Sequence, residues 1–182
     1  MKQEIIEKIE IPENVEVSVE ENLVKVKYNH NETSRRFNFY GVEVKKEGNE
    51  VIIESKKATK RELKVIYTIK AHINNMFSGI REPFLYKMEI AFVHFPMTVE
   101  HDKNKGILTI KNFLGEKKPR IVKINKGVEI KIEKNIVTVT SNNKELAGQS
   151  AANIEKATHV RNKDRRKFQD GIFITEKPGR II

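Results

Sequence analysis

GVEVKKEGNEVIIES, at residues 41–55, is repeated as GVEIKIEKNIVTVTS at residues 127–141, with an offset of 86 residues from Gly41 to Gly127. In both copies a glycine opens an alternating apolar run, and a polar turn followed by a second apolar run completes the segment. Two alternating runs joined by a short polar turn are typical of a β-hairpin. The sequence therefore contains the same predicted hairpin twice.

The similarity continues beyond the hairpins. Glu62-Leu63 matches Glu145-Leu146 at an offset of 83 residues, from Glu62 to Glu145. A small change in the offset is expected when duplicated units differ in loop length. The pattern predicts two copies of a unit of about 80 residues, and we place the domains at residues 1–82 and 83–182.

Each copy shows strands followed by a helix. Period-two alternation predicts strands at residues 15–19, 23–26, 51–53, 107–110, 128–132 and 136–139. Polar turns separate them at residues 20–22, 47–49 and 133–135. The fold class is therefore predicted as α+β, in which each domain is an antiparallel sheet with a helix packed on one face and the other face free.

The two helices are predicted to begin at matching capping boxes. Thr59 with Glu62, and Asn142 with Glu145, each place a short polar acceptor three residues before a carboxylate. The first helix carries an apolar stripe at Leu63, Ile66, Ile69, Ile73 and Met76, and the second a thinner one at Leu146, Gln149 or Ser150, Ala151, Ile154 and Ala157.

Gly148 lies inside the second helix, where glycine costs about 1 kcal/mol relative to alanine. Two interpretations are open. The small residues Gly148, Ser150, Ala151 and Ala152 either let another surface such as an RNA backbone approach, or let the helix sit deep against its own sheet.

The positive charge is concentrated in the second half of the chain. The 182 residues carry a net charge of +10. Residues 1–82 contribute 15 Lys and Arg against 14 Asp and Glu, whereas residues 83–182 contribute 20 against 11. An imbalance of this size predicts a polyanionic partner, and a merely solvated basic surface is the alternative.

Other protein classes are disfavoured by composition. The chain contains no cysteine, so it has no disulfide framework and no thiol nucleophile. No apolar run approaches the roughly 20 residues of a membrane span, and the N-terminus lacks the apolar core of a signal peptide. We expect a cytoplasmic protein that neither enters a membrane nor acts on a small-molecule substrate.

A dense basic loop follows the second helix. It contains Arg161, Lys163, Arg165, Arg166 and Lys167 and is followed at once by the apolar run 171–174. Arg165 and Arg166 are predicted to grip phosphates with two donors each, while Lys163 and Lys167 act as point charges. Arg161 either joins them or caps the last carbonyls of its helix.

Phe168, interleaved with these charges, either stacks on an unpaired base or anchors the loop to the domain, and anchoring is the more usual role. Asp164 and Asp170 are assigned to turns or to holding the arginines. We predict Asp170-Gly171 to be a turn.

Two further basic groups are candidates for RNA contact. Lys117, Lys118 and Arg120, followed by Lys123 and Lys126, either enter an RNA groove or protect a strand edge from pairing. Lys177 and Arg180 lie in a C-terminal tail for which Pro178 and Gly179 favour an extended path, so that the tail orders only against RNA or a neighbouring protein.

Residues 149–177, together with Asn-Phe-Leu-Gly-Glu-Lys at 112–117, resemble the large-subunit ribosomal protein L-six family in its archaeal and eukaryotic form, whose eukaryotic members are called L-nine. The resemblance covers the whole chain and is most specific in the C-terminal pattern. There, Phe173 stands where tyrosine is common in the family, so a hydroxyl contact is in doubt.

The resemblance implies a structural protein with two duplicated domains, assembled on large-subunit ribosomal RNA in the cytoplasm. It further implies a position near the sarcin-ricin loop and the stalk base, with neighbouring ribosomal proteins and translation factors close by. A free-standing nucleic-acid-binding module is the alternative function.

Catalytic patterns are weak in this sequence. The histidines, at positions 30, 72, 94, 101 and 159, are scattered, and none forms a pair with metal-ligand spacing. The glycines at 41, 48, 79 and 106 fall singly and form no phosphate-binding loop. We therefore predict no enzyme activity, no cofactor and no metal, and an RNA-modifying enzyme is the least favoured function.

Overall fold

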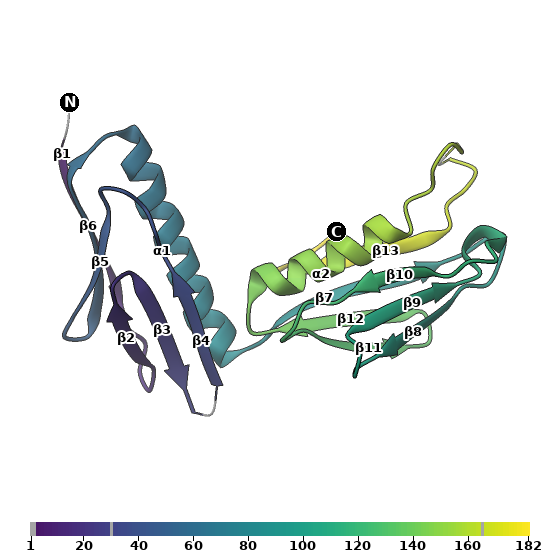
Figure 1. The fold of residues 1–182 in the computed structure, drawn as a ribbon, viewed down its shortest axis with the longest axis horizontal. Helices are drawn as coiled ribbons and strands as arrows, with labels where there is room; N and C mark the ends of the chain where they lie inside the picture. Colours follow the sequence, from purple (N-terminus) through teal and green to yellow (C-terminus); the bar gives the residue numbers. More distant parts are fainter. Residues whose placement is uncertain (1–2, 30, 165) are drawn as a thin grey trace. The chain divides into compact units, whose positions relative to one another are not determined.

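The computed structural model describes residues 3–29, 31–164 and 166–182, and the chain divides into two compact units, Met1–Glu82 and Pro83–Ile182. We call these the first and second unit (Figure 1). The elements of the first unit are β1 (Gln3–Glu10), β2 (Glu16–Glu20), β3 (Leu23–Tyr28), β4 (Asn31–Arg36), β5 (Glu43–Glu47), β6 (Glu50–Ala58) and α1 (Lys60–Arg81).

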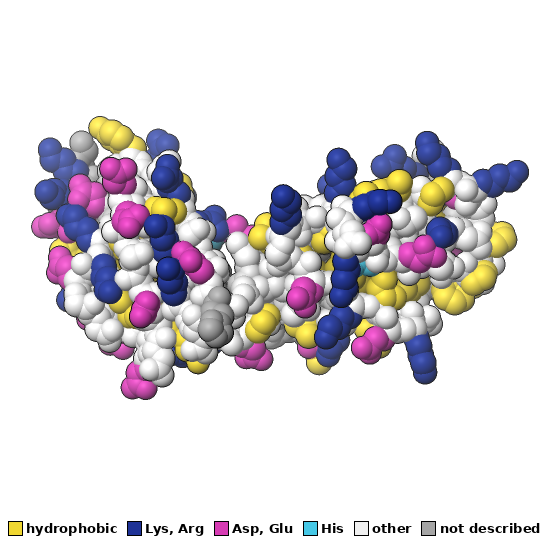
Figure 2. Space-filling view, turned by 60° about the horizontal axis from the view of Figure 1, so that its bottom comes forward, with side chains coloured by type: hydrophobic (Ala, Val, Ile, Leu, Met, Phe, Trp, Pro, Cys, Tyr) yellow, Lys and Arg dark blue, Asp and Glu magenta, His cyan; other side chains and the backbone are white. Residues whose placement is uncertain are grey.

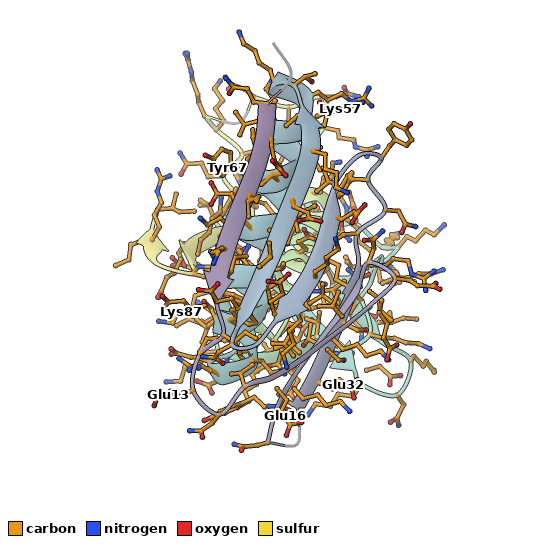
Figure 3. All side chains as sticks on the ribbon, turned by 90° about the vertical axis from the view of Figure 1, so that its left-hand side faces the viewer. Glu13, Glu16, Glu32, Lys57, Tyr67 and Lys87 are labelled. Atoms are coloured by element: carbon orange, nitrogen blue, oxygen red, sulfur yellow. The ribbon has the colours of Figure 1, made fainter. Side chains whose placement is uncertain are left out.

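The first unit is built from two antiparallel three-stranded sheets, in the orders β1-β6-β5 and β2-β3-β4. Helix α1 contacts strands of both sheets, and Figure 3 shows it behind the β1-β6-β5 sheet. The helix begins at Thr59, which forms the predicted capping box with Glu62. The core lies between the helix and the sheets and contains the fully buried Ile53, Ile66 and Ile73.

The second unit repeats this order of elements. They are β7 (Phe84–Ala91), β8 (Thr98–Asp102), β9 (Ile107–Lys111), a 3-10 turn η1 (Phe113–Gly115), β10 (Arg120–Lys123), β11 (Glu129–Glu133), β12 (Ile136–Ser141), α2 (Lys144–Ala157), β13 (Gly171–Lys177) and β14 (Arg180–Ile181). One sheet has the order β10-β9-β8, and the other, β11-β12-β7-β13-β14, gains two strands that follow the helix. The predicted α+β class with two duplicated domains is confirmed, although each unit contains two sheets where the sequence suggested one.

The repeated sequence forms equivalent hairpins, β5-β6 and β11-β12. The outer face of the five-stranded sheet is free, as expected, since the neighbouring residues Ile136, Glu89 and Phe173 are all exposed. No helix among the residues described above is long and apolar enough to cross a membrane.

The predicted cap of the second helix is wrong by one residue. The side chain of Asn143, and not that of Asn142, accepts hydrogen bonds from the N–H groups of Glu145 and Leu146. Glu145 is consequently one position too early to complete a capping box. Asn142 and Asn143 both carry a side-chain amide oxygen that can cap a helix, so the sequence pattern alone does not distinguish them.

Gly148 serves the packing of α2 against its own sheet. A Cβ at this position would lie 2.9 Å from the Tyr86 hydroxyl oxygen and 3.3 Å from its Cζ. Tyr86 lies on β7 and is buried. Close approach of helix and sheet therefore requires glycine, which supports the second of the two interpretations.

Strand β13 pairs with β14 only at its C-terminal end. Before that point, side chains in and just after α2 accept hydrogen bonds from its backbone. Thr158 Oγ1 accepts a hydrogen bond from the N–H of Ile172 at 2.9 Å. Glu155 Oε1 accepts one from the N–H of Ile174 at 3.2 Å. Backbone donors near the edge of the sheet are thus satisfied within the unit.

Candidate RNA-binding surface

Three loops meet at one end of the second unit. They are residues 92–97 between β7 and β8, residues 112–119 between β9 and β10, and residues 158–170 between α2 and β13. Arg120, which directly follows the second of these loops, connects it to the third: its Nη1 donates to the Ala157 carbonyl at 2.7 Å and to the His159 carbonyl at 3.4 Å. Asn112 Nδ2 likewise donates to the Pro96 carbonyl at 3.0 Å. We call this surface the three-loop end.

Asp170 joins two of these loops. Its side chain is buried, and Oδ1 accepts hydrogen bonds from the N–H groups of Val93 at 2.7 Å and His94 at 3.0 Å. Oδ2 lies 2.6 Å from His94 Nδ1. Burial alone would raise the pKa of Asp170, but the hydrogen bonds from His94 and Val93 outweigh it and hold the pKa below its ordinary value.

The prediction of a turn at Asp170-Gly171 is therefore wrong. Gly171 begins a strand, and Asp170 faces inward. Asp164, in contrast, does form a turn, since its carbonyl accepts the N–H groups of Lys167 and Phe168 and its Oδ1 accepts that of Arg166.

Phe168 anchors the basic loop. Its ring stacks on the His94 ring with a centroid distance of 4.8 Å and packs against the core. Lys163 Nζ lies 4.4 Å from the centroid of the same ring. These contacts support the anchoring interpretation. The Phe168 ring packs on His94, and Asp170 holds His94 in place.

The described cations of the basic loop are exposed, and within the described residues none of them forms an ion pair. They are Arg161, Lys163, Arg166 and Lys167. Arg165 lies outside the described residues. The loop therefore offers positive charges to an anion at positions fixed by Asp164 and Phe168.

The second basic group separates into two parts. Lys117 and Lys118 are exposed on the loop between β9 and β10 and have no ion-pair partner in the described chain. Arg120 is instead engaged within the protein: it pairs with Glu116, lies 4.1 Å over the Phe113 ring, and donates to the Ala157 and His159 carbonyls. The pairing keeps the pKa of Glu116 below its ordinary value.

Arg120, and not Arg161, thus binds the last carbonyls of α2, so we assign Arg120 a structural role. The remaining predicted residues, Lys177 and Arg180, lie at the far end of β13, roughly 20 Å along the strand from the basic loop at about 3.3 Å per residue. The structure does not bring them to the three-loop end.

The extended path predicted for the tail is wrong. Lys177 pairs with Arg180 across a two-residue turn, and the N–H of Ile182 bonds the Thr175 carbonyl at 2.9 Å. Gly179 has φ +77°. Proline followed by a glycine of positive φ suits a type II turn, which the interpretation as a free tail overlooked.

The geometry offers little for catalysis. A groove beside the basic loop is lined in part by Ala152, Lys156, Phe168 and Phe173, and none of its described lining residues is a nucleophile hydrogen-bonded to a base. Residues 3–29, 31–164 and 166–182 contain no group of three or more His, Asp or Glu placed to hold a metal ion.

Comparison with known proteins gives a consistent result. The family model described as Ribosomal protein L6 matches residues 11–83 and 95–171, one segment in each unit. The large ribosomal subunit protein uL6 of Methanococcus vannielii is 45% identical over 178 residues, covering 98% of this chain and 97% of the relative. The protein of the same name from Methanobrevibacter smithii is 43% identical over 173 residues, covering 95% and 96%, and that of Methanothrix thermoacetophila is 38% identical over 177 residues, covering 97% and 99%.

Proposed function

Because this chain belongs to the ribosomal protein L6 family, we propose that it is a structural constituent of the large ribosomal subunit that binds large-subunit ribosomal RNA through the three-loop end. The observation that carries this proposal is a set of exposed cations that form no ion pair within the described residues, on loops that Asp170 and Arg120 hold in place. The protein acts in the cytoplasm, within the ribosome.

The mechanism is charge neutralisation at fixed positions. Arg161, Lys163, Arg166 and Lys167, joined by Lys117, Lys118 and Arg165, contact phosphates and release their counterions. Because the loops are braced, the spacing of the cations selects the shape of a folded RNA backbone. No bond is made or broken, and the proposal assigns no catalytic step.

The family further supports a position near the sarcin-ricin loop and the stalk base, with translation factors and neighbouring ribosomal proteins close by. Nucleotide protection mapping on the assembled large subunit tests this position. Protection confined to other regions of the RNA would remove it while leaving RNA binding intact.

Salt dependence tests the binding surface. If the basic loop neutralises about five phosphates, that loop alone contributes roughly −3.5 to −4.5 to the slope of log affinity against log salt concentration. Replacing Arg166 and Lys167 with alanine flattens the slope by about 1.4 to 1.8, at about 0.7 to 0.9 per phosphate. The charge-matched control replaces the exposed Lys46 and Lys57 of the first unit with alanine. Figure 3 labels Lys57. This control should leave the salt slope unchanged.

An unchanged slope in the Arg166/Lys167 variant would refute the assignment of this surface. A chain that binds duplex DNA as tightly as folded ribosomal RNA at one salt concentration would instead behave as a free-standing nucleic-acid-binding module.

A further inference from the structure

Exposed apolar side chains lie on the loop between β7 and β8, which contacts both basic loops of the three-loop end through Asp170 and Gly115. Phe92 is 40%, Val93 71% and Phe95 47% exposed, and all belong to the loop between β7 and β8. Figure 2 shows hydrophobic side chains beside Lys and Arg side chains at one end of this unit. Three exposed apolar side chains within one short loop indicate a contact surface.

This loop is held rigidly. The N–H groups of Val93 and His94 are fixed by the buried Asp170 carboxylate, in the middle of the loop. The Phe95 ring packs on the turn at Gly115, with Cε2 and Cζ both 3.6 Å from the position that a Cβ would take there. Because the loop is already ordered, a partner that covers these side chains loses little binding energy to ordering them.

The surrounding charges select the partner. Lys117 and Lys118 lie on one neighbouring loop and Lys163 and Lys167 on the other, all exposed. The nearby carboxylates are already engaged, Asp170 with His94 and Glu116 with Arg120. A fitting partner is therefore polyanionic and also presents flat apolar faces. Unpaired nucleotides have both properties, since their phosphates are charged and their bases stack on aromatic rings.

We propose that Phe95, with Phe92 and Val93 beside it, contacts an unpaired nucleobase of the RNA whose phosphates bind the basic loops. This inference rests on the proposed function and adds a second kind of contact to it. The bases stack on the exposed surface of Phe95, while the cations on either side hold the flanking backbone.

Substitution of Phe95 in the full chain tests the contact. Binding to large-subunit ribosomal RNA at one salt concentration should weaken roughly 5- to 100-fold in Phe95→Ala, the range for losing one stacked base. Phe95→Leu keeps the packing on Gly115 but lacks an aromatic face, and should also weaken binding. Tyr40→Ala removes a fully exposed aromatic side chain of the first unit and is the matched control, expected to bind as the unmodified protein does.

The salt slope separates this contact from the phosphate contacts. Phe95→Ala lowers affinity with the slope unchanged, because a neutral side chain releases no counterions. The chain contains no tryptophan, so Phe95→Trp introduces a single reporter at the contact. Its fluorescence should be quenched by the ribosomal RNA and much less by a fully paired RNA duplex of equal length.

Three results would overturn the inference. The first is unchanged affinity in Phe95→Ala while Arg166/Lys167 variants weaken binding, which leaves the proposed function standing. The second is full recovery of affinity and melting temperature in Phe95→Leu, which reduces Phe95 to a packing residue. The third is failure of the unmodified chain to bind the RNA at any salt concentration, which removes the proposed function as well.

Discussion

At the scale of single residues, Asp170 does the most to shape the three-loop end. Its carboxylate accepts hydrogen bonds from the side chain and N–H of His94 and from the N–H of Val93, residues that precede it by 76 and 77 positions. No local pattern in the sequence indicates such a pairing, and an aspartate before a glycine suggests a turn. The long-range contact decides its role.

Asp170→Asn should lower the free energy of unfolding by roughly 1–3 kcal/mol at neutral pH, because a charge-assisted hydrogen bond to His94 is lost. The pKa of Asp170 lies below its ordinary value, so the carboxylate stabilises the fold above about pH 4 and this contribution is lost as pH falls through the folded pKa. Denaturant unfolding of both proteins from pH 2 to pH 7 checks this. A stability difference that stayed constant down to pH 2 would contradict it.

Gly148→Ala should destabilise the second unit although alanine is the better helix former. The gain of about 1 kcal/mol in helix propensity is opposed by overpacking against Tyr86, which costs roughly 1–3 kcal/mol. In a Tyr86→Phe background the nearest atom, 2.9 Å from the new Cβ, is gone. Gly148→Ala should therefore lower the melting temperature less in the Tyr86→Phe background than in the unmodified chain. Thermal unfolding of the unmodified chain, the two single variants and the double variant measures this difference.

At the scale of elements, local chemistry predicted the hairpins and the first helix well. The turn at residues 133–135 and the cap at Thr59 depend on neighbours along the chain, and both formed as expected. Arg120 and the C-terminal tail were misjudged. The guanidinium finds its partners 37 and 39 residues away, and the tail pairs with a strand whose position only the fold defines.

Arg120 closes the C-terminal end of α2 and should be sensitive to conservative change. Arg120→Lys is expected to cost roughly 1–3 kcal/mol, because one ammonium cannot satisfy both Glu116 and the helix carbonyls. Hydrogen exchange of amides 157–160 should also accelerate. Exchange rates and stability equal to those of the unmodified chain would show that the Arg120 contacts are dispensable. The control is Lys111→Arg, because Lys111 on β9 also pairs with a glutamate, Glu100, but is exposed.

At the scale of the whole molecule, the two units share an architecture and differ in charge. Each has its own hydrophobic core, with Ile66 in one and Ile154 in the other. The charge excess lies in the second unit. Duplication was visible in the sequence because both copies keep the same hairpin. The basic loop of the three-loop end follows the second helix and lies beyond the segments that the repeat aligns.

A fragment of residues 83–182 should fold alone and bind large-subunit ribosomal RNA with the salt slope of the full chain. A fragment of residues 1–82, with 15 cationic against 14 acidic residues, should bind only weakly. Circular dichroism establishes folding, and filter binding over a salt series gives both slopes. Equal affinity of the two fragments would show that the first unit carries an RNA site of its own.

The hydrogen bonds that the N–H groups of Ile172 and Ile174 on β13 donate to Thr158 and Glu155 also matter for a chain that is not yet bound to RNA. An open strand edge invites a second molecule to add its own strand there. Because acceptors of the same molecule already engage these donors, this edge of β13 offers fewer partners for strand addition by a second chain.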